Sequence, residues 1–221
     1  MASSAVQFLA KELRSLLNSP IEGFTVEASE DNLLKWKVGI FGPPGTIYEG
    51  GYFKANLNFP ANYPYEPPTM RFTSPLFHPN IFESGSICIS ILHPPVDDPQ
   101  NDQEDISERW NPTQSVRTVL LSVISLLNEP NTSSPANVEA SRSYKAWKAG
   151  QSTDYERTVK QQVAQSKKQA EMDGIIVPTS LEDYCMKEGQ QVEEGYTDAD
   201  FYDNGDENYG DDYYSDEEDE E

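Results

Sequence analysis

HPNIFESGSICISIL, residues 78–92, is the stretch on which the interpretation of the whole chain depends. It places Cys88 eight residues after Asn80, the last residue of a His-Pro-Asn tripeptide. An acidic stretch follows and ends at Trp110-Asn111-Pro112. A lone cysteine is usually a small, inert apolar residue, but Cys88 follows a glycine-containing turn, which weakens that interpretation. Cys88 is therefore the first candidate for a chemical role.

Upstream of this stretch, the hydrophobic pattern predicts one helix and four strands. Apolar residues recur at helical spacing over residues 5–18, and Pro20 and Gly23 end that helix. Strands are predicted over residues 24–27, 33–41, 52–59 and 69–72. In the second strand Trp36 and Val38 alternate with polar residues, as in a strand with one buried face and one face in water. The short links between the strands predict an antiparallel meander.

Downstream, both periodicities disappear over residues 74–112. A connection of 39 residues is too long for an ordinary loop and indicates a functional one. Three helices follow, and they are predicted over residues 113–128, 138–149 and 153–171. Thr113 would cap the first of them. The order of elements predicts an α+β fold.

The charge of the chain is concentrated near its end. The 221 residues carry a net charge of −22, of which −3 falls in residues 1–170 and −19 in residues 171–221. Such an acidic segment repels itself and buries little apolar surface, so a disordered tail is predicted over 173–221. The acidic balance excludes ordinary nucleic-acid binding, which needs a basic face. No membrane span or signal peptide is recognised, so an intracellular location is expected.

The cysteine and histidine content limits the possible chemistry. Cys88 and Cys185 are the only cysteines, which is too few for a disulfide framework, and Cys185 lies in the tail region. A cysteine hydrolase would need a base near its thiol, usually histidine. The only histidines, His78 and His93, both precede proline in predicted loops, and neither has an evident orienting partner. The hydrolase interpretation is therefore disfavoured.

The chain resembles the ubiquitin-conjugating enzymes over about residues 5–170. The resemblance is carried by YPYEPP at residues 63–68, by the His-Pro-Asn tripeptide with Cys88, and by Trp110-x-Pro112. It implies the ubiquitin-conjugating fold for a catalytic domain at residues 1–172. It also implies that Cys88 accepts ubiquitin as a thioester from the activating enzyme and passes it to a lysine. No bound cofactor or metal is expected, because the activating enzyme consumes the ATP. The expected location is cytoplasmic and nuclear.

The resemblance assigns roles to four residues. Cys88 would be the nucleophile, since a thiolate exchanges acyl groups readily. Asn80 would stabilise the oxyanion, where one positioned amide donor is worth about 3 kcal/mol, or brace the loop beneath it; a plain turn role is the other alternative. His78 would hydrogen-bond within the loop. Ser134 matches a position that is often Asp in the family, and its hydroxyl would be a poor base; an ordinary loop role remains open.

The largest departure from the family is an acidic insertion at about residues 97–109, which separates Cys88 from Trp110 by 22 residues. It contains six acidic residues: Asp97, Asp98, Asp102, Glu104, Asp105 and Glu108. Such charge runs are usually solvated surface loops, but negative charge beside the nucleophile would attract and orient an acceptor lysine. An acidic insertion with an acidic tail resembles the subclass that works with cullin-RING ligases and builds degradation-directed chains. The hypothesis is that the insertion positions acceptor ubiquitin.

Four further residues match the positions at which the family docks RING domains. They are Lys11 and Arg14 in the first helix, Tyr65 in the proline-rich loop, and Thr113 after Pro112. Each has a plain alternative as a solvated helix residue, a packed loop residue or a helix cap. The family also uses the first helix to bind the activating enzyme, so the two partners would exclude each other.

The end of the tail combines charge with aromatic residues. Residues 188–221 hold 16 acidic residues among 34 and no Lys or Arg. Six aromatic residues are interleaved: Tyr196, Phe201, Tyr202, Tyr209, Tyr213 and Tyr214. A tail that only solubilises the protein has no need of them, so we expect docking on a basic groove of the cullin, with fast, salt-dependent association. Ser215 resembles a site for an acidophilic kinase.

A non-catalytic binding module is the remaining alternative. It would be either an inactive ubiquitin-conjugating variant or a histone-binding protein with an acidic tail. Inactive variants typically lack the cysteine, whereas this chain keeps Cys88 and Asn80.

Overall fold

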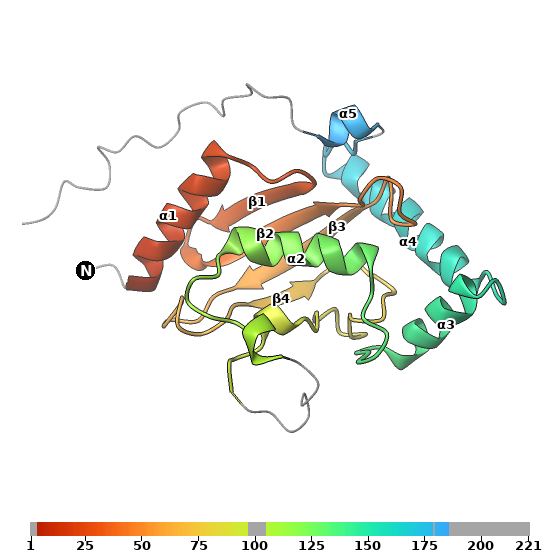
Figure 1. The fold of residues 1–221 in the computed structure, drawn as a ribbon. Helices are drawn as coiled ribbons and strands as arrows, with labels where there is room; N and C mark the ends of the chain where they lie inside the picture. The colour runs from red at the N-terminus through yellow and green to blue at the C-terminus, as the bar shows by residue number, and fades with distance from the viewer. Residues whose placement is uncertain (1–3, 97–104, 179, 186–221) are drawn as a thin grey trace, which may run out of the picture. The chain divides into compact units, whose positions relative to one another are not determined.

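A single antiparallel sheet of four strands forms the centre of the fold (Figure 1). The structure is a computed structural model, and it describes residues 4–96, 105–178 and 180–185. Helix α1 (Ser4–Asn18) precedes the sheet. The strands are β1 (Phe24–Ser29), β2 (Asn32–Phe41), β3 (Tyr52–Asn58) and β4 (Thr69–Phe72), and they pair in the order of the sequence. The predicted meander is confirmed.

The register of the sheet places apolar residues opposite one another. Trp36 of β2 pairs with Leu57 of β3, Val38 pairs with Ala55, and the adjacent Ile40 pairs with Phe53. All six are buried. Because side chains alternate between the two faces of a strand, this register gathers the apolar set of both strands on one face.

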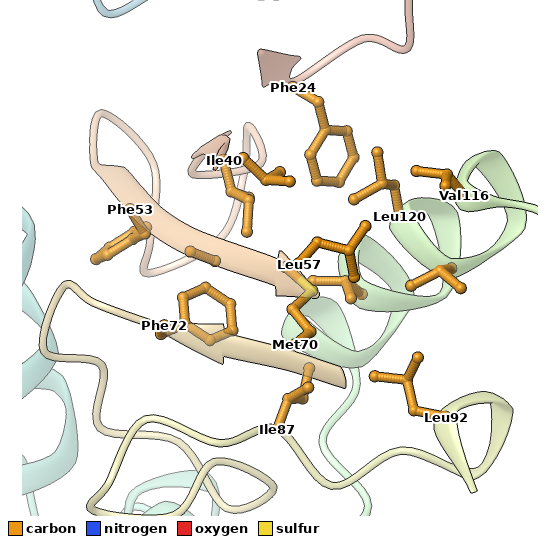
Figure 2. Close-up of a cluster of buried hydrophobic side chains, with 14 of the residues drawn as sticks. Phe24, Ile40, Phe53, Leu57, Met70, Phe72, Ile87, Leu92, Val116 and Leu120 are labelled. Atoms are coloured by element: carbon orange, nitrogen blue, oxygen red, sulfur yellow. The ribbon is translucent and has the colours of Figure 1, made fainter. Parts of the chain in front are cut away.

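Among the described residues, a long loop and four α-helices follow the sheet. The loop contains two short 3-10 helices, η1 (Ser90–Leu92) and η2 (Ile106–Glu108). The helices are α2 (Val116–Asn128), α3 (Val138–Lys148), α4 (Asp154–Met172) and a single turn, α5 (Leu181–Tyr184). Val116 and Leu120 of α2 belong to the core cluster with Leu57 and Met70 of the sheet and Leu92 of η1 (Figure 2). The apolar stripe of α2 therefore covers the buried face of the sheet.

The start of α2 corrects the sequence prediction. The cap is Ser115 rather than Thr113, and the helix begins at Val116. Ser115 Oγ accepts a hydrogen bond from the Thr118 N–H, and Thr118 Oγ1 accepts one from the Ser115 N–H, which is a capping box. Thr113 instead belongs to a turn that Asn111 closes. The backbone N–H and the hydroxyl of Thr113 both donate hydrogen bonds to Asn111 Oδ1.

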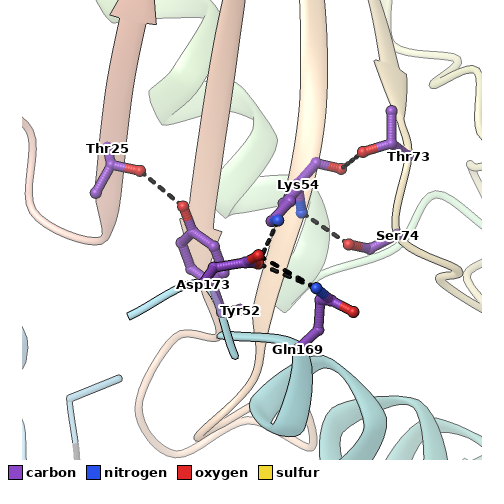
Figure 3. Close-up of polar contacts among 7 residues, drawn as sticks. All are labelled: Thr25, Tyr52, Lys54, Thr73, Ser74, Gln169 and Asp173. Carbon is purple, nitrogen blue, oxygen red and sulfur yellow. Dashed lines mark hydrogen bonds and ion pairs between the residues drawn. The ribbon is translucent and has the colours of Figure 1, made fainter. Parts of the chain in front are cut away.

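Helix α4 is attached to the sheet through β3. The Tyr52 N–H donates to Ser166 Oγ of α4 at 3.1 Å, and its hydroxyl is 3.1 Å from Thr25 Oγ1 of β1. Lys54 forms an ion pair with Asp173, just beyond the end of α4 (Figure 3). These contacts fix α4 and the residues after it against the strand edge.

The described structure continues beyond the predicted domain boundary at residue 172. Residues 173–178 and 180–185, which were assigned to the disordered tail, include α5. A Cβ atom placed on Gly23, at φ +80°, would lie 2.0 Å from the Tyr184 hydroxyl oxygen, so α5 packs closely against the turn before β1. Residues 186–221, including Ser215 and the six aromatic residues, lie outside the described residues. None of the described helices is long and apolar enough to cross a membrane.

Candidate active site

Cys88 lies at the end of a tight turn that is held against β4. Residue 85 is a glycine at φ +87°, and an added Cβ would lie 2.1 Å from the Phe72 carbonyl oxygen. Only glycine adopts this conformation at no steric cost and permits so close an approach of two backbones. The Phe72 N–H donates to the Gly85 carbonyl at 2.8 Å, and the Cys88 N–H donates to the Asn80 carbonyl at 2.9 Å. The thiol is half-buried.

The side chain of Asn80 is 2% exposed and is bound to the loop that follows α2. Its Oδ1 accepts a hydrogen bond from the Asn131 N–H at 2.8 Å. Its Nδ2 donates to the Asn131 carbonyl at 2.8 Å and to the Ser134 carbonyl at 3.4 Å. These are the contacts of a residue that braces a loop, and they engage the amide that an oxyanion would need.

His78 is fully buried beneath the same turn. Its Nδ1 accepts a hydrogen bond from the Asn80 N–H at 3.0 Å, so the proton of the neutral ring sits on Nε2, which is 3.1 Å from the Leu126 carbonyl. Burial lowers the pKa of His78 to about 4, against a smaller opposing effect of the Leu126 carbonyl. The ring is therefore neutral at physiological pH, and both its nitrogens are engaged away from Cys88.

The tripeptide is also held from the side of α3 and α4. The Asn137 N–H, at the cap of α3, donates to the Pro79 carbonyl at 2.8 Å. The Phe77 N–H donates to Gln162 Oε1 of α4 at 2.7 Å. Two buried hydroxyls, Tyr48 and Tyr155, are 2.8 Å apart nearby, and burial raises the pKa of each. The backbone beneath Cys88 is thus fixed by residues that follow it in the sequence.

Ser134 lies in the loop that Asn80 holds, and it is exposed. Its backbone makes two hydrogen bonds there: the N–H donates to Asn131 Oδ1 at 3.3 Å, and the carbonyl accepts from Asn80 Nδ2. The position of Ser134 is therefore set through its backbone.

A residue that the sequence interpretation set aside lies beside the thiol. His93 Nε2 is 3.7 Å from Cys88 Sγ, within hydrogen-bonding reach for sulfur. The His93 N–H donates to the Ser90 carbonyl at 2.9 Å, and its carbonyl accepts from the Trp110 N–H at 3.0 Å. The two bonds hold the backbone of His93 beside Cys88. The expectation that neither histidine has an orienting partner is wrong for His78, whose two ring nitrogens are both engaged. The separation of His93 from Cys88 by five residues was the only sequence signal, and proline at residue 94 masked it.

The two ends of the acidic insertion meet beside His93. The His93–Trp110 backbone hydrogen bond closes its base, and the Arg109 guanidinium donates to the Val96 carbonyl one step further out. The Trp110 indole N–H donates to the Pro64 carbonyl at 2.8 Å, which ties the base to the proline-rich loop. Both ends of the insertion are therefore held beside Cys88.

Two of the six acidic residues fall within the described part of the insertion. Asp105 is exposed and caps η2, where hydrogen bonds from Ser107 lower the pKa of its carboxyl group. Glu108 is also exposed. The other four, Asp97, Asp98, Asp102 and Glu104, lie outside the described residues.

The four candidate docking residues are exposed, and their segments are joined. Tyr65 is 71% exposed, and Lys11, Arg14 and Thr113 are exposed as well. Glu12 of α1 accepts hydrogen bonds from the Tyr63 hydroxyl in the proline-rich loop and from the Val116 N–H of α2. A single carboxylate therefore links the first helix, the proline-rich loop and the start of α2.

The described residues contain no group of three or more His, Cys, Asp or Glu side chains placed to hold a metal ion.

Comparison with known proteins gives a consistent result. A family model described as ubiquitin-conjugating enzyme matches residues 8–163. Ubiquitin-conjugating enzyme E2 7 of Arabidopsis thaliana is 51% identical over 146 residues, which is 66% of this chain and 87% of the relative. Ubiquitin-conjugating enzyme E2 15 of Schizosaccharomyces pombe is 46% identical over 145 residues, 65% of this chain and 86% of the relative. A ubiquitin-conjugating enzyme E2 of African swine fever virus (isolate Pig/Kenya/KEN-50/1950) is 52% identical over 139 residues, 63% and 61% of the two chains.

Proposed function

The chain belongs to the ubiquitin-conjugating enzyme family, and we propose that it extends degradation-directed ubiquitin chains together with a cullin-RING ligase. Its partners as a family member are ubiquitin and the ubiquitin-activating enzyme. The observation that carries the site assignment is the placement of Cys88, half-buried at the end of a turn whose backbone is held by Asn80 and β4.

The proposed chemistry uses Cys88 twice. Its thiolate attacks the thioester carbonyl on the activating enzyme, so ubiquitin moves onto Cys88 Sγ. The amine of an acceptor lysine then attacks the new thioester, an amide bond forms, and Cys88 leaves as thiolate. Asn80 holds the loop of residues 131–134 in place during the second step, and Ser134 lies in that loop. We propose no bound cofactor, because ATP is consumed by the activating enzyme.

A charging assay tests this assignment. The full chain is incubated with activating enzyme, ATP and ubiquitin, and separated on a gel with and without reductant. We expect a band heavier by one ubiquitin that reductant removes, both in the wild type and in Cys185→Ser, the matched control. Cys88→Ser should give no reductant-sensitive band. A reductant-sensitive band that persists in Cys88→Ser, or that Cys185→Ser removes, would contradict the assignment.

Ligase docking is proposed on the surface formed by Lys11, Arg14, Tyr65 and Thr113. The linkage of their three segments through Glu12 supports this, since a docking surface needs its parts in fixed relation. Tyr65→Ala should reduce ligase-dependent discharge of ubiquitin and leave charging intact. Equal loss in the absence of the ligase would argue for a folding defect instead.

The acidic tail is proposed to dock on a basic cullin surface, and the protein is proposed to act in cytoplasm and nucleus. The net charge of −19 over residues 171–221 supports an electrostatic partner. Truncation after Cys185 keeps α5 and its contact with Gly23. We expect this variant to lose ligase-dependent rate and its sensitivity to salt, measured from about 50 to about 300 mM salt, roughly a sixfold change in ionic strength. An unchanged rate and salt dependence would exclude the tail from ligase binding.

A further inference from the structure

Cys88 and His93 form a thiol–imidazole pair at the base of the acidic insertion. Sγ and Nε2 are 3.7 Å apart, and both residues are half-buried, so the pair is reachable from solvent. The contact spans only five residues because Ser90–Leu92 form a 3-10 turn, which brings His93 back over Cys88. Local chain geometry therefore creates the pair.

The backbone of His93 is held on both sides of its Cα atom. The His93 N–H is bound to Ser90, and its carbonyl is bound to Trp110, whose side chain is buried. Trp110 is in turn fixed to Pro64. These contacts fix the Cα position of His93, and its ring nitrogen lies 3.7 Å from the thiol. His78, the other histidine, has both ring nitrogens engaged elsewhere.

We propose that His93 is a catalytic residue, which accepts the proton of the Cys88 thiol when ubiquitin is loaded. The inference rests on the proposed role of Cys88 and deepens the same site. The lone pair of His93 Nε2 takes the proton from Sγ, which gives a thiolate and an imidazolium. The thiolate forms the new S–C bond to ubiquitin, and the C–S bond to the activating enzyme breaks. The released thiolate takes a proton from solvent, and the imidazolium returns one to solvent.

The chemical reason is that only the thiolate is nucleophilic, and histidine is the side chain that takes up a proton near neutral pH. The segments that hold the pair also carry charged residues of both signs, whose effects on proton transfer between the thiol and the imidazole oppose one another: Arg71, Glu83, Asp105, Glu108 and Arg109. Carboxylates favour the imidazolium and oppose the thiolate, and arginines do the reverse. The direct contact at 3.7 Å distinguishes His93 from these groups.

Alkylation of the two cysteines by iodoacetamide tests the proposal without ubiquitin. Rates at Cys88 and Cys185 are measured by mass spectrometry in the same molecule from pH 5.5 to 10, so Cys185 is an internal reference. His93→Gln keeps a hydrogen-bonding amide near the position of Nε2 but cannot accept a proton. We expect Cys88 of this variant to react about tenfold more slowly at pH 7, which corresponds to one unit on the pH axis. The two proteins should converge at pH 10.

The proposal would be overturned if the alkylation rate of Cys88 depended on pH in the same way in His93→Gln and the wild type. It would also be overturned if the variant reacted more slowly by the same factor at every pH. Because no ubiquitin is present, this outcome is distinct from failure of the charging assay.

A second measurement avoids any change at His93. The ring is titrated by NMR in the wild type and in Cys88→Ser, which removes the thiol. If the two groups exchange a proton, their titrations are coupled, and the midpoint of the His93 titration should move by on the order of one pH unit. An identical titration in the two proteins would refute the pairing.

Discussion

The side chain of Asn80 and the backbone of Asn131 form two reciprocal hydrogen bonds, each 2.8 Å long. Asn80 lies eight residues before Cys88, and Asn131 lies in the loop after α2, so one amide joins the two sides of the candidate site. The arrangement resembles a pair in a β-ladder, with the side chain of Asn80 in place of a second backbone. The loop containing Ser134 is therefore tied to the Cys88 side of the site by the Asn80 side chain.

Replacing Asn80 by alanine should loosen that loop. Both backbone groups of Asn131 lose their partner, and we expect a loss of about 1–3 kcal/mol in the free energy of unfolding. Discharge of ubiquitin to free lysine should fall by about a hundredfold, because a displacement of the reacting groups by about 1 Å can cost that much. The measurements are urea denaturation, single-turnover discharge, and amide hydrogen exchange over residues 131–134.

Asn131→Ala is the matched control for Asn80→Ala. It removes the acceptor for the Ser133 and Ser134 N–H groups and leaves the Asn80 amide in place. A brace predicts faster exchange of the loop in both variants. Slow discharge in Asn80→Ala with unchanged exchange would instead assign Asn80 to the oxyanion.

His78 should make the protein less stable in mild acid. The pKa of His78 is about 4 in the fold, below the unfolded value of about 6.5. Between about pH 4 and about pH 6.5, His78 is therefore protonated in the unfolded chain and neutral in the native protein. The stabilising contribution is full above pH 6.5 and declines as the pH falls toward 4, by up to about 3 kcal/mol. Urea denaturation at half-unit pH steps measures this loss.

The assignment to His78 can be checked by NMR, because the chain has only two histidines. In His93→Gln the remaining histidine signal belongs to His78, and we expect it to titrate near pH 4. If the His78 signal of folded His93→Gln titrates near pH 6.5 instead, the prediction is wrong.

Ser115→Ala should destabilise the start of α2. It removes the side-chain half of the capping box, which typically costs about 1 kcal/mol. Thr113→Ala is the control, because its side chain makes a turn contact with Asn111 rather than a helix cap. Chemical denaturation of both variants is the measurement. A larger loss in Thr113→Ala would mean that the helix is capped at Thr113 in solution.

Gly23→Ala should test the packing of α5. Both Gly23 and Gly45 adopt positive φ, and a Cβ at Gly45 meets open space. Either substitution should cost about 1–2 kcal/mol of backbone strain, and Gly23→Ala should cost more because it displaces Tyr184. Thermal melts should show this excess disappearing in a Tyr184→Ala background. An excess that persists there would place its cause outside α5.

Deleting residues 97–108 should slow chain extension on ubiquitin more than charging of Cys88. The proposed cause is loss of the negative charge that attracts the acceptor lysine. The matched variant keeps the length of the insertion and replaces its six acidic residues by Asn and Gln. This neutralised variant should extend chains as slowly as the deletion variant does. High salt screens the charge and should lower the extension rate of the wild type toward the same value. If extension is unchanged in both variants, the insertion does not position the acceptor.

Local sequence patterns are sufficient to predict the elements of the fold and to propose Cys88 as the nucleophile. Alternation in residues 33–41 and the helical stripe in 116–128 are local patterns, and they need no tertiary information because each element exposes one apolar face. Cys88 was identifiable for the same reason, since its tripeptide, its turn and the following Trp-x-Pro are contiguous or closely spaced.

Only the tertiary structure decided how the site is assembled. Asn80 meets a loop 51 residues away, and Glu12 meets Val116 across 104 residues. The backbone of His93 is bound to that of Trp110, on the far side of the acidic insertion. Tyr184 belongs to the fold because Gly23 leaves room for it, although the sequence around it reads as tail. Propensities and spacings describe one segment at a time, whereas hydrogen-bond partners distant in sequence are chosen by which segments the packed sheet and helices bring together.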